Sequence, residues 1–447
     1  MIHCIPAASR ASPASMTETT ILDWVRGDIL GLEFPAHPEA LQSGGPEFLT
    51  RAFRAGGALG EDNRVTHITA LDECMLGGTG VKLLLSVAYE RDAPGLSRDL
   101  FVKFSRNFQD KVRDGGRYHM PSEVRLANLS REPDFPVAVP KCFYADIQQE
   151  TLTGVIITDR IAYGQGVTEP HYPKCMDQIL PEPLAHYRAL VSSLAQLSGA
   201  HKSGRLGDVV EGYFPLDLGA LVERRPRFEA PLLAKRINRL AEFISQYPHL
   251  APAHIADRAF LDGFCADALL AVEQQEEIGR FLYSRPDMIA LCHMNANIDN
   301  AWFWREPDGA LRSGLLDWGS VGQMSVASSI WGCLGAAEPE THDRHLDELL
   351  DLFVAEYARA GGPMLDRREL AQHLELHVMM SALHMTTAPP AILREVPDPG
   401  AVADRYDPVF TANETARVQL KVTISLLNMW ERRDLGRLLR ADACWRR

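Results

Sequence analysis

The clearest alternation of apolar and polar positions lies between residues 64 and 105, where short apolar runs are typical of β-strands. VTHITALDECM and VKLLLSVAYE are joined by the loop LGGTG, and RDLFVKFS follows after the turn DAPGLS. MPSEVRLANLSRE then predicts a helix with Pro121 in its first turn, and PKCFYADI and TGVIITDR predict two more strands. This order predicts a small, mostly antiparallel sheet covered by one helix.

The rest of the chain has mainly helical periodicity. Residues 20–60 have helical patterning with polar breaks, and from about Pro183 onward apolar residues recur at helical spacing. The longer predicted helices cover residues 184–204, 255–283, 343–362, 367–385 and 416–433, and a proline-rich loop is predicted at 389–400. We therefore predict a disordered extension at 1–15, an N-terminal lobe that contains the sheet at 16–162, and a helical C-terminal lobe at 163–447.

Composition and charge narrow the class of protein. The chain has 447 residues, of which 46% are hydrophobic and 23% charged, as in an ordinary globular protein. Its net charge of −13 and the lack of a Lys or Arg run argue against a nucleic-acid partner. No apolar run approaches the roughly 20 residues that cross a bilayer. The 8 cysteines include no C-x-x-C pair, which favours reduced thiols and a cytoplasmic protein.

The segment between residues 288 and 322 changes to short strands and loops, and it holds the candidate chemistry. LCHMNANIDNAWFW at 291–304 is followed by LLDWGSVGQ at 315–323. The amide oxygen of Asn300 and the carboxylate of Asp317 are the oxygen ligands that Mg²⁺ prefers, so together they predict a metal clamp. Asp317-Trp318-Gly319 alone is also compatible with an ordinary turn, and His293 alone with a hydrogen-bonded core residue. The prediction of a metal site therefore depends on His293, Asn300 and Asp317 occurring together in this order, not on any one of them.

Two upstream features point to a phosphate site. Lys103 lies in the middle of the third predicted strand, and Glu123 opens the next predicted helix at a distance suited to pairing with it. A lone lysine in a strand is often an edge residue whose amine reaches water, whereas the alternative is a cation against nucleotide phosphates. Gly77, Gly78 and Gly80 are compatible with a simple hairpin turn or with a loop whose N–H groups approach phosphate oxygens.

Over roughly residues 60–340 these features resemble the aminoglycoside phosphotransferase and choline-kinase-like superfamily. The resemblance implies an α+β, bilobal, protein-kinase-like fold, with a small antiparallel-sheet N-lobe and a large, mainly helical C-lobe. It also implies ATP between the lobes and Mg²⁺ as cofactors.

The resemblance assigns expected roles to individual residues of this chain. Lys103 would contact the α- and β-phosphates and be held by Glu123. Asn300 and Asp317 would bind Mg²⁺, and His293 would brace the catalytic loop. The hinge that meets the adenine would consist of Thr158, Asp159, Arg160 and Ile161.

Two positions depart from the family pattern, which has aspartate where this chain has Asn295 and often glycine where it has Met294. An amide cannot take a proton from the acceptor, and general-base help is typically worth about 10²–10⁴-fold. Positioning and metal electrostatics carry most of the acceleration of phosphoryl transfer, so a slow kinase is physically possible. The first hypothesis is an ATP- and Mg²⁺-dependent phosphotransferase acting on a hydroxyl of a small molecule. The alternatives are a nucleotide-binding pseudokinase and a nucleotidyl (AMP) transferase.

Two further patterns favour structural interpretations. His373 and His377 have metal-like spacing on one helical face but lack the adjacent glutamate of a zinc protease, so helix packing is a sufficient explanation. Trp302 and Trp304, in the strand after Asn300, are predicted to belong to the core.

Overall fold

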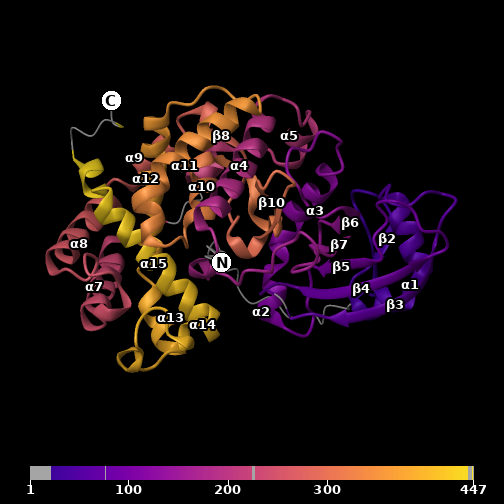
Figure 1. The fold of residues 1–447 in the computed structure, drawn as a ribbon, viewed down its shortest axis with the longest axis horizontal. Coiled ribbons are helices and arrows are strands. Elements are labelled where there is room, and N and C mark those ends of the chain that lie inside the picture. Colours follow the sequence, from indigo (N-terminus) through magenta and orange to yellow (C-terminus); the bar gives the residue numbers. More distant parts are fainter. Residues whose placement is uncertain (1–21, 76, 224–226, 441–444, 446–447) are drawn as a thin grey trace.

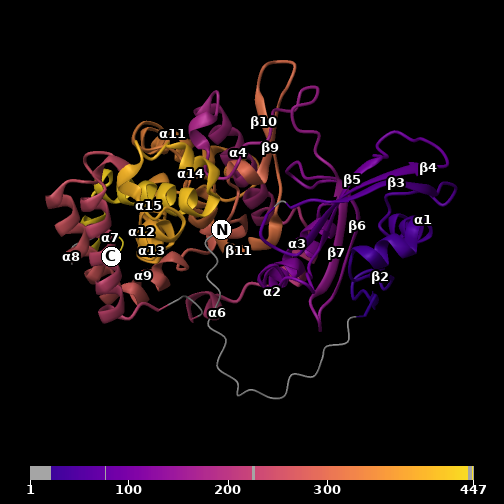
Figure 2. The ribbon, with the colours of Figure 1, turned by 90° about the horizontal axis from the view of Figure 1, so that it is seen from below.

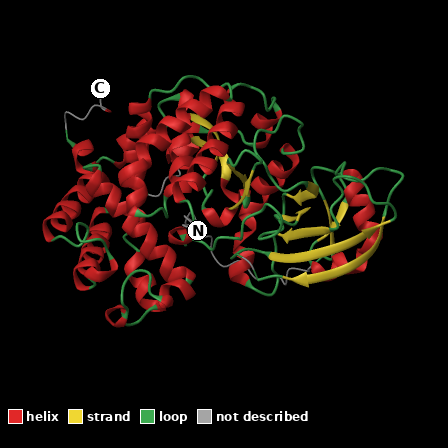
Figure 3. Cartoon of the chain, viewed as in Figure 1, coloured by secondary structure: helices red, strands yellow, loops and turns green. Residues whose placement is uncertain are grey.

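The computed structural model describes residues 22–75, 77–223, 227–440 and 445. The predicted extension at 1–15 lies outside the described residues. In Figure 1 the chain forms a sheet-containing lobe, drawn in indigo and purple, beside a larger helical lobe in magenta, orange and yellow. Figure 3 shows the same division by secondary structure. The predicted fold class, an antiparallel-sheet lobe joined to a mainly helical lobe, is confirmed.

The N-terminal lobe is built on five antiparallel strands in the order β3-β4-β5-β7-β6. Their bounds are β3 Val65–Glu73, β4 Val81–Tyr89, β5 Asp99–Phe104, β6 Cys142–Gln148 and β7 Thr153–Asp159. The five strands predicted from apolar periodicity are therefore present. The helical patterning with polar breaks at residues 20–60 is confirmed by α1 (Pro38–Ala55) but is wrong for the first part, where β1 (Trp24–Arg26) and β2 (Glu33–Pro35) form a short hairpin.

Two helices, one on each face, cover this sheet, whereas the sequence predicted one covering helix (Figure 2). Helix α1 packs on the outer face, where its Phe48 and Phe53 join Leu83, Leu85 and other buried residues in one apolar cluster. Helix α3 (Met120–Leu129) packs on β6 and β7 from the side of the helical lobe. The sheet face on that inner side is therefore shared between α3 and the candidate site.

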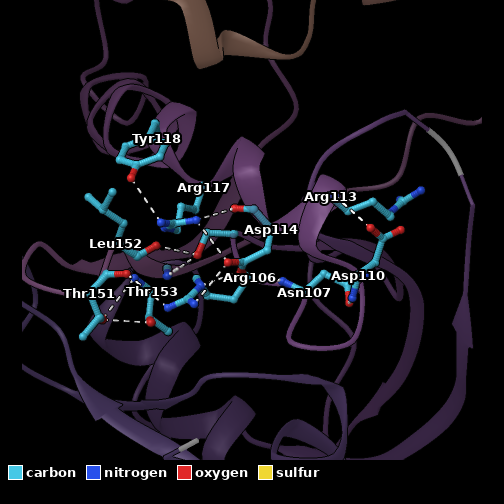
Figure 4. Close-up of polar contacts among 12 residues, drawn as sticks. Arg106, Asn107, Asp110, Arg113, Asp114, Arg117, Tyr118, Thr151, Leu152 and Thr153 are labelled. Atoms are coloured by element: carbon cyan, nitrogen blue, oxygen red, sulfur yellow. Dashed lines mark hydrogen bonds and ion pairs between the residues drawn. The ribbon is translucent and has the colours of Figure 1, made fainter. Parts of the chain in front are cut away.

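A polar network ties the segment between β5 and α3 to the sheet (Figure 4). This segment contains α2 (Lys111–Asp114) and the 3-10 turn η1 (Gly115–His119). The Asp114 carboxylate accepts from Arg106 Nε at 2.6 Å and from Arg117 Nη1 at 3.1 Å, and Arg106 Nη1 also donates to the Thr151 carbonyl at 3.2 Å. The β6–β7 turn thereby anchors the residues that lead into α3.

The C-terminal lobe is mainly helical and contains the largest apolar core. Its helices are α4 Pro183–Lys202, α5 Val209–Tyr213, α6 Leu218–Glu223, α7 Ala230–Gln246, α8 Arg258–Glu273, α9 Gln275–Leu282, α10 Val326–Leu334, α11 Pro339–Arg359, α12 Arg367–Met385, α13 Ala388–Glu395, α14 Pro408–Ala412 and α15 Glu414–Arg432. Among the described residues, none of the helices is both long and apolar enough to span a membrane.

Two helix predictions in this lobe are wrong. The single helix expected at 255–283 is divided into α8 and α9, because the backbone leaves helical geometry at Gln274 and the side-chain amide of Gln275 donates to the Val272 carbonyl at 2.9 Å. The proline-rich loop expected at 389–400 begins with α13, whose prolines lie in the first turn, where their missing N–H groups cost no hydrogen bond.

Two small antiparallel strand pairs lie within the helical lobe, on its side toward α3 (Figures 1 and 2). Strand β8 (Ile289–His293) pairs with β11 (Val321–Ser325), and β9 (Ala301–Arg305) pairs with β10 (Leu311–Leu315). The loops between these strands hold the residues that the sequence singled out. Trp302 and Trp304 face away from the core, contrary to prediction: both are half-buried and stacked on each other, whereas Phe303 between them is buried.

Candidate active site

A buried ion pair joins the sheet to α3. The Lys103 ammonium, in β5, lies 2.7 Å from both carboxylate oxygens of Glu123, in the first turn of α3. The two side chains are only 11% and 8% exposed. Burial alone would lower the pKa of Lys103, but the carboxylates of Asp317 and Glu123 raise it above its usual value, so the amine stays charged. The sheet thus presents a fixed cation toward the helical lobe.

Asp317 lies on the opposite side of that cation. Lys103 Nζ is 3.1 Å from Asp317 Oδ1, and the charge of Lys103 holds the pKa of the Asp317 carboxyl well below its usual range. Asp317 has φ 55° and ψ 62°, a left-handed conformation that is uncommon for a residue other than glycine. The adjacent Leu316 N–H donates to the Asn300 carbonyl at 2.8 Å, so the turn that carries Asp317 lies directly beside Asn300.

His293 connects the loop after β8 to this turn. Its Nε2 donates to the Leu316 carbonyl at 2.8 Å, and its Nδ1 accepts from the Asn295 N–H at 3.2 Å. These two contacts require the neutral ring with its proton on Nε2. Burial lowers the pKa of His293 to about 4, which is consistent with that form. His293 therefore fixes the loop at Asn295 relative to the residue before Asp317.

Asn295 is held at three points by its own loop. Besides the contact to His293, its Oδ1 accepts from Asn297 Nδ2 at 2.8 Å and its carbonyl accepts from Asn300 Nδ2 at 2.8 Å. The hydrogen bond from Asn300 Nδ2 orients the Asn300 side chain, because its amide nitrogen faces the Asn295 carbonyl and its amide oxygen is the end left for a ligand. The hydrogen bond from Asn297 uses one lone pair of the Asn295 amide oxygen, so this oxygen can accept one further hydrogen bond and the NH₂ group can donate.

Three of these residues line a small pocket between the lobes, whose lining is Thr79, His119, Glu123, Asn295, Asp317, Gly319 and Ser320. The sequence did not single out His119, which precedes α3 and whose Nδ1 donates to the Gly319 carbonyl at 3.1 Å. A Cβ at Gly319 would lie 2.7 Å from the Cβ of His119 and 3.0 Å from Glu123 Oε1. Glycine at this position therefore allows the Asp317 turn to approach the start of α3.

The glycine-rich loop between β3 and β4 bends over the end of β5. Gly77 and Gly80 have φ of 63° and 56°, and a Cβ at Gly80 would lie 1.9 Å from the Phe104 carbonyl oxygen. Gly80 and Arg113 also exchange two hydrogen bonds of 3.0 Å, from the Gly80 N–H to the Arg113 carbonyl and from Arg113 Nε to the Gly80 carbonyl. Gly78 has no such constraint in the structure. The loop is thus fixed directly beside Lys103.

The predicted hinge consists of the last two residues of β7 and the two residues after it, at the opposite end of the sheet from the glycine-rich loop. Thr158 pairs with Phe101 across the strands. The N–H groups of Asp159 and Arg160 donate to the carbonyls of Lys141 and Asp99 at 2.9 and 3.2 Å, so neither is free for a base. Ile161 makes no main-chain hydrogen bond to another described residue.

The donors at Asn300 and Asp317 fit a magnesium ion. One is an amide oxygen and the other an ionised carboxylate, and Mg²⁺ binds few protein oxygens while it keeps several waters. Among the described residues, no group of three or more His, Cys, Asp or Glu could form a site for a metal that needs more protein ligands. His373 and His377 do not form one: His373 is fully buried, and His377 Nδ1 lies 3.3 Å from the Ser328 hydroxyl.

Comparison with known proteins yields structural similarities only. No protein-family model and no curated protein matches the chain. It is similar to a microcompartment-associated aminopropanol kinase, with 13% identity over 88% of this chain and 100% of that chain and a TM-score of 0.41. It is also similar to a Plasmodium vivax ethanolamine kinase (12%, covering 82% and 83%, TM-score 0.39) and to aminoglycoside 2′-phosphotransferase-IIIa in complex with GDP (12%, covering 80% and 93%, TM-score 0.35). Similarities this weak carry no argument about what the chain does. A proposal about its activity must therefore rest on the residues of the site.

Proposed function

We propose that this chain is an ATP- and Mg²⁺-dependent phosphotransferase that acts on a hydroxyl group of a small molecule. One observation carries the proposal: Lys103, Glu123 and Asp317 come from the sheet, α3 and the helical lobe, and they meet through contacts of 2.7 and 3.1 Å. A buried charged triad is costly to assemble unless its charges are used. Its place beside a glycine-rich loop suits a polyphosphate.

Each residue has a distinct task in this proposal. Lys103, oriented by Glu123, donates to phosphate oxygens and offsets their charge. Mg²⁺, held by Asn300 and Asp317, would neutralise further negative charge on the phosphates. His293 acts as a positioning residue because it keeps Asn295 and the Asp317 turn in register. The acceptor is bound by the helical lobe, where the hydroxyl would approach along the loop that carries Asn295.

Asn295 favours a second candidate, a nucleotide-binding protein without transfer activity. Its side-chain oxygen already accepts from Asn297, and an amide cannot take the acceptor's proton. Asp299, a carboxylate in the same loop, is 14% exposed and lies 3.6 Å from the amine of Lys174. We favour the active enzyme because the candidate metal ligands are both present and because positioning and electrostatics carry most of the acceleration in phosphoryl transfer.

Nucleotide binding is the first test. Calorimetric titration of ATP should show tighter binding with Mg²⁺ than without it. Lys103→Ala and Asp317→Ala should each weaken binding about 10-fold or more, since each removes a charge-assisted contact. Asp262→Ala is the matched control, because Asp262 is an exposed carboxylate on α8 paired with Arg258, four residues earlier. If ATP affinity were unchanged in both site variants, the kinase-type nucleotide site would have no basis.

The mass of the product then separates the hypotheses. A panel of small-molecule alcohols incubated with ATP and Mg²⁺ should yield a product heavier by one phosphate. Addition of AMP would show nucleotidyl transfer instead. Binding of ATP without any product across the panel would favour the pseudokinase.

A further inference from the structure

A second lysine, Lys82, lies directly beside Lys103. Lys82 in β4 and Lys103 in β5 are opposite each other in the antiparallel register, so their side chains lie on the same face of the sheet. Lys82 is 6% exposed and Lys103 is 9% exposed. Like charges in directly opposite positions destabilise a sheet, and burial makes that repulsion stronger. Two buried ammonium groups side by side are unfavourable unless a negatively charged group binds next to them.

The carboxylates of the site form ion pairs with Lys103, whereas their charges act on Lys82 only from a longer distance. Lys103 forms ion pairs with Glu123 and Asp317. For Lys82, the hydrogen bond in the structure is from its Nζ to the main-chain carbonyl of Thr79, and no ion pair joins it to a carboxylate among the described residues. Burial and the nearby charges of Lys103 and Arg113 lower the pKa of Lys82 to about 8. Lys82 is therefore a buried cation with a neutral partner.

The position of the Lys82 amine suggests what the missing partner is. A Cβ at Gly77 would lie 3.3 Å from Lys82 Nζ, so the amine sits directly under the glycine-rich loop. Arg113 Nε binds the Gly80 carbonyl on the same loop. The loop thus has positive groups beneath it and beside it, together with the backbone of Gly77 to Gly80. An anion with several oxygens fits this environment.

We propose that Lys82 is a second phosphate-binding residue, which contacts the terminal phosphates of the bound nucleotide beneath the glycine-rich loop while Lys103 contacts the phosphates nearer the nucleoside. This inference rests on the proposed nucleotide site and extends it by one residue. The competing explanation is structural, with Lys82 serving only to hold the loop through the Thr79 carbonyl. A neutral donor could perform that task without placing a charge opposite Lys103.

Titration calorimetry with a series of ligands tests the inference. The ligands are adenosine, ATP with Mg²⁺, and inorganic tripolyphosphate with Mg²⁺. The variant is Lys82→Met, which removes the charge and keeps most of the length of the side chain. Affinity for ATP and for tripolyphosphate should fall about 10- to 100-fold, as expected for loss of a charged hydrogen bond, while affinity for adenosine stays the same. Lys82→Arg should retain most of the affinity. Lys202→Met is the control, because that half-buried lysine on α4 also donates to a main-chain carbonyl, that of Pro286.

Thermal melting of the ligand-free proteins separates a binding role from a structural one. Lys82→Met should melt at the same temperature as the wild type or higher, because it removes the repulsion with Lys103. The structural role predicts a lower melting temperature and rescue of loop stability by a neutral donor in Lys82→Gln. A lower melting temperature combined with unchanged tripolyphosphate affinity would overturn the inference.

The ligand series also separates this inference from the proposed function. Equal ATP affinity in wild type and Lys82→Met would refute the role of Lys82 and leave the kinase proposal standing. Conversely, tripolyphosphate binding that depends on Lys82, without any added affinity from the adenosine part of ATP, would support the phosphate site and refute an ATP-dependent kinase. A wild-type protein that binds neither ATP nor tripolyphosphate would overturn both.

Discussion

Removal of Lys103 is expected to destabilise the protein more than removal of the whole ion pair. In Lys103→Met, the Glu123 carboxylate keeps its buried position, where its side chain is 8% exposed, but it loses the cation 2.7 Å away. Asp317 loses the same partner, so two carboxylates face each other without a charge between them. The double variant Lys103→Met/Glu123→Met replaces the pair with apolar side chains and leaves only Asp317, which is 28% exposed and reaches water.

The magnitudes follow from the burial of the pair. Breaking a buried ion pair by removing one partner typically costs about 3–5 kcal/mol, because the remaining charge is uncompensated. Replacing both partners by apolar residues of similar volume is often neutral. We therefore expect Lys103→Met to lower the free energy of unfolding by about 3 kcal/mol or more and the double variant to recover about 2 kcal/mol or more of that loss.

The coupling energy between Lys103 and Glu123 is measured by urea denaturation followed by circular dichroism. The proteins compared are the wild type, Lys103→Met, Glu123→Met and the double variant. The same cycle on Arg258 and Asp262, which are 80% and 60% exposed with a contact of 3.0 Å, serves as the control and should give about 0.3–0.5 kcal/mol. A Lys103–Glu123 coupling no larger than that of the exposed pair would refute the assignment of a buried, dehydrated ion pair.

Two further predictions concern Asn295 and His373. If the chain is a slow kinase, Asn295→Asp supplies the proton acceptor, so phosphate transfer or ATP hydrolysis should rise by up to ~10²–10⁴-fold, and a lower turnover would show that the amide is fitted to its own substrate. His373 is fully buried with neither ring nitrogen hydrogen-bonded, and burial lowers its pKa from 6.5 to about 4. As the pH falls from 6.5 to 4 the unfolded chain binds a proton that the folded chain does not, so the protein should lose about 3 kcal/mol through this residue. His373→Leu should lose less stability than the wild type between about pH 7 and pH 4.5 in urea denaturation, and an equal loss would contradict this account.

Local sequence patterns determined most of the secondary structure. The five strands of the sheet and α3, α4, α11, α12 and α15 lie where apolar periodicity predicted them, because period 2 and period 3.6 are properties of neighbouring residues. The patterns failed where a boundary depended on proline chemistry or on a distant contact, such as the 3.0 Å hydrogen bond from the Gln274 side-chain amide to the Leu439 carbonyl. Gln274 separates α8 from α9, and the prolines at the start of α13 begin a helix instead of a loop.

The order of polar residues along the chain also predicted that Lys103, Glu123, Asn300 and Asp317 belong to one site. Their types and spacing match what phosphate and metal binding would require, so the prediction needs the sequence alone. The distances that join these residues are not contained in the sequence. Glu123 and Asp317 are 194 positions apart in the chain, and only folding places both on the same ammonium group.

Other features became visible only in the tertiary structure. Lys82 is one of 46 Lys and Arg residues, and nothing in its neighbours distinguishes it until the strand register places it opposite Lys103. His119 gains meaning only where α3 meets Gly319. Trp302 and Trp304 were predicted in the core, yet Phe303 between them takes the buried position. The sequence determines which residues can form an element or bind an ion, because those properties are local, whereas burial, charge pairing and partner identity depend on the segments that folding brings together.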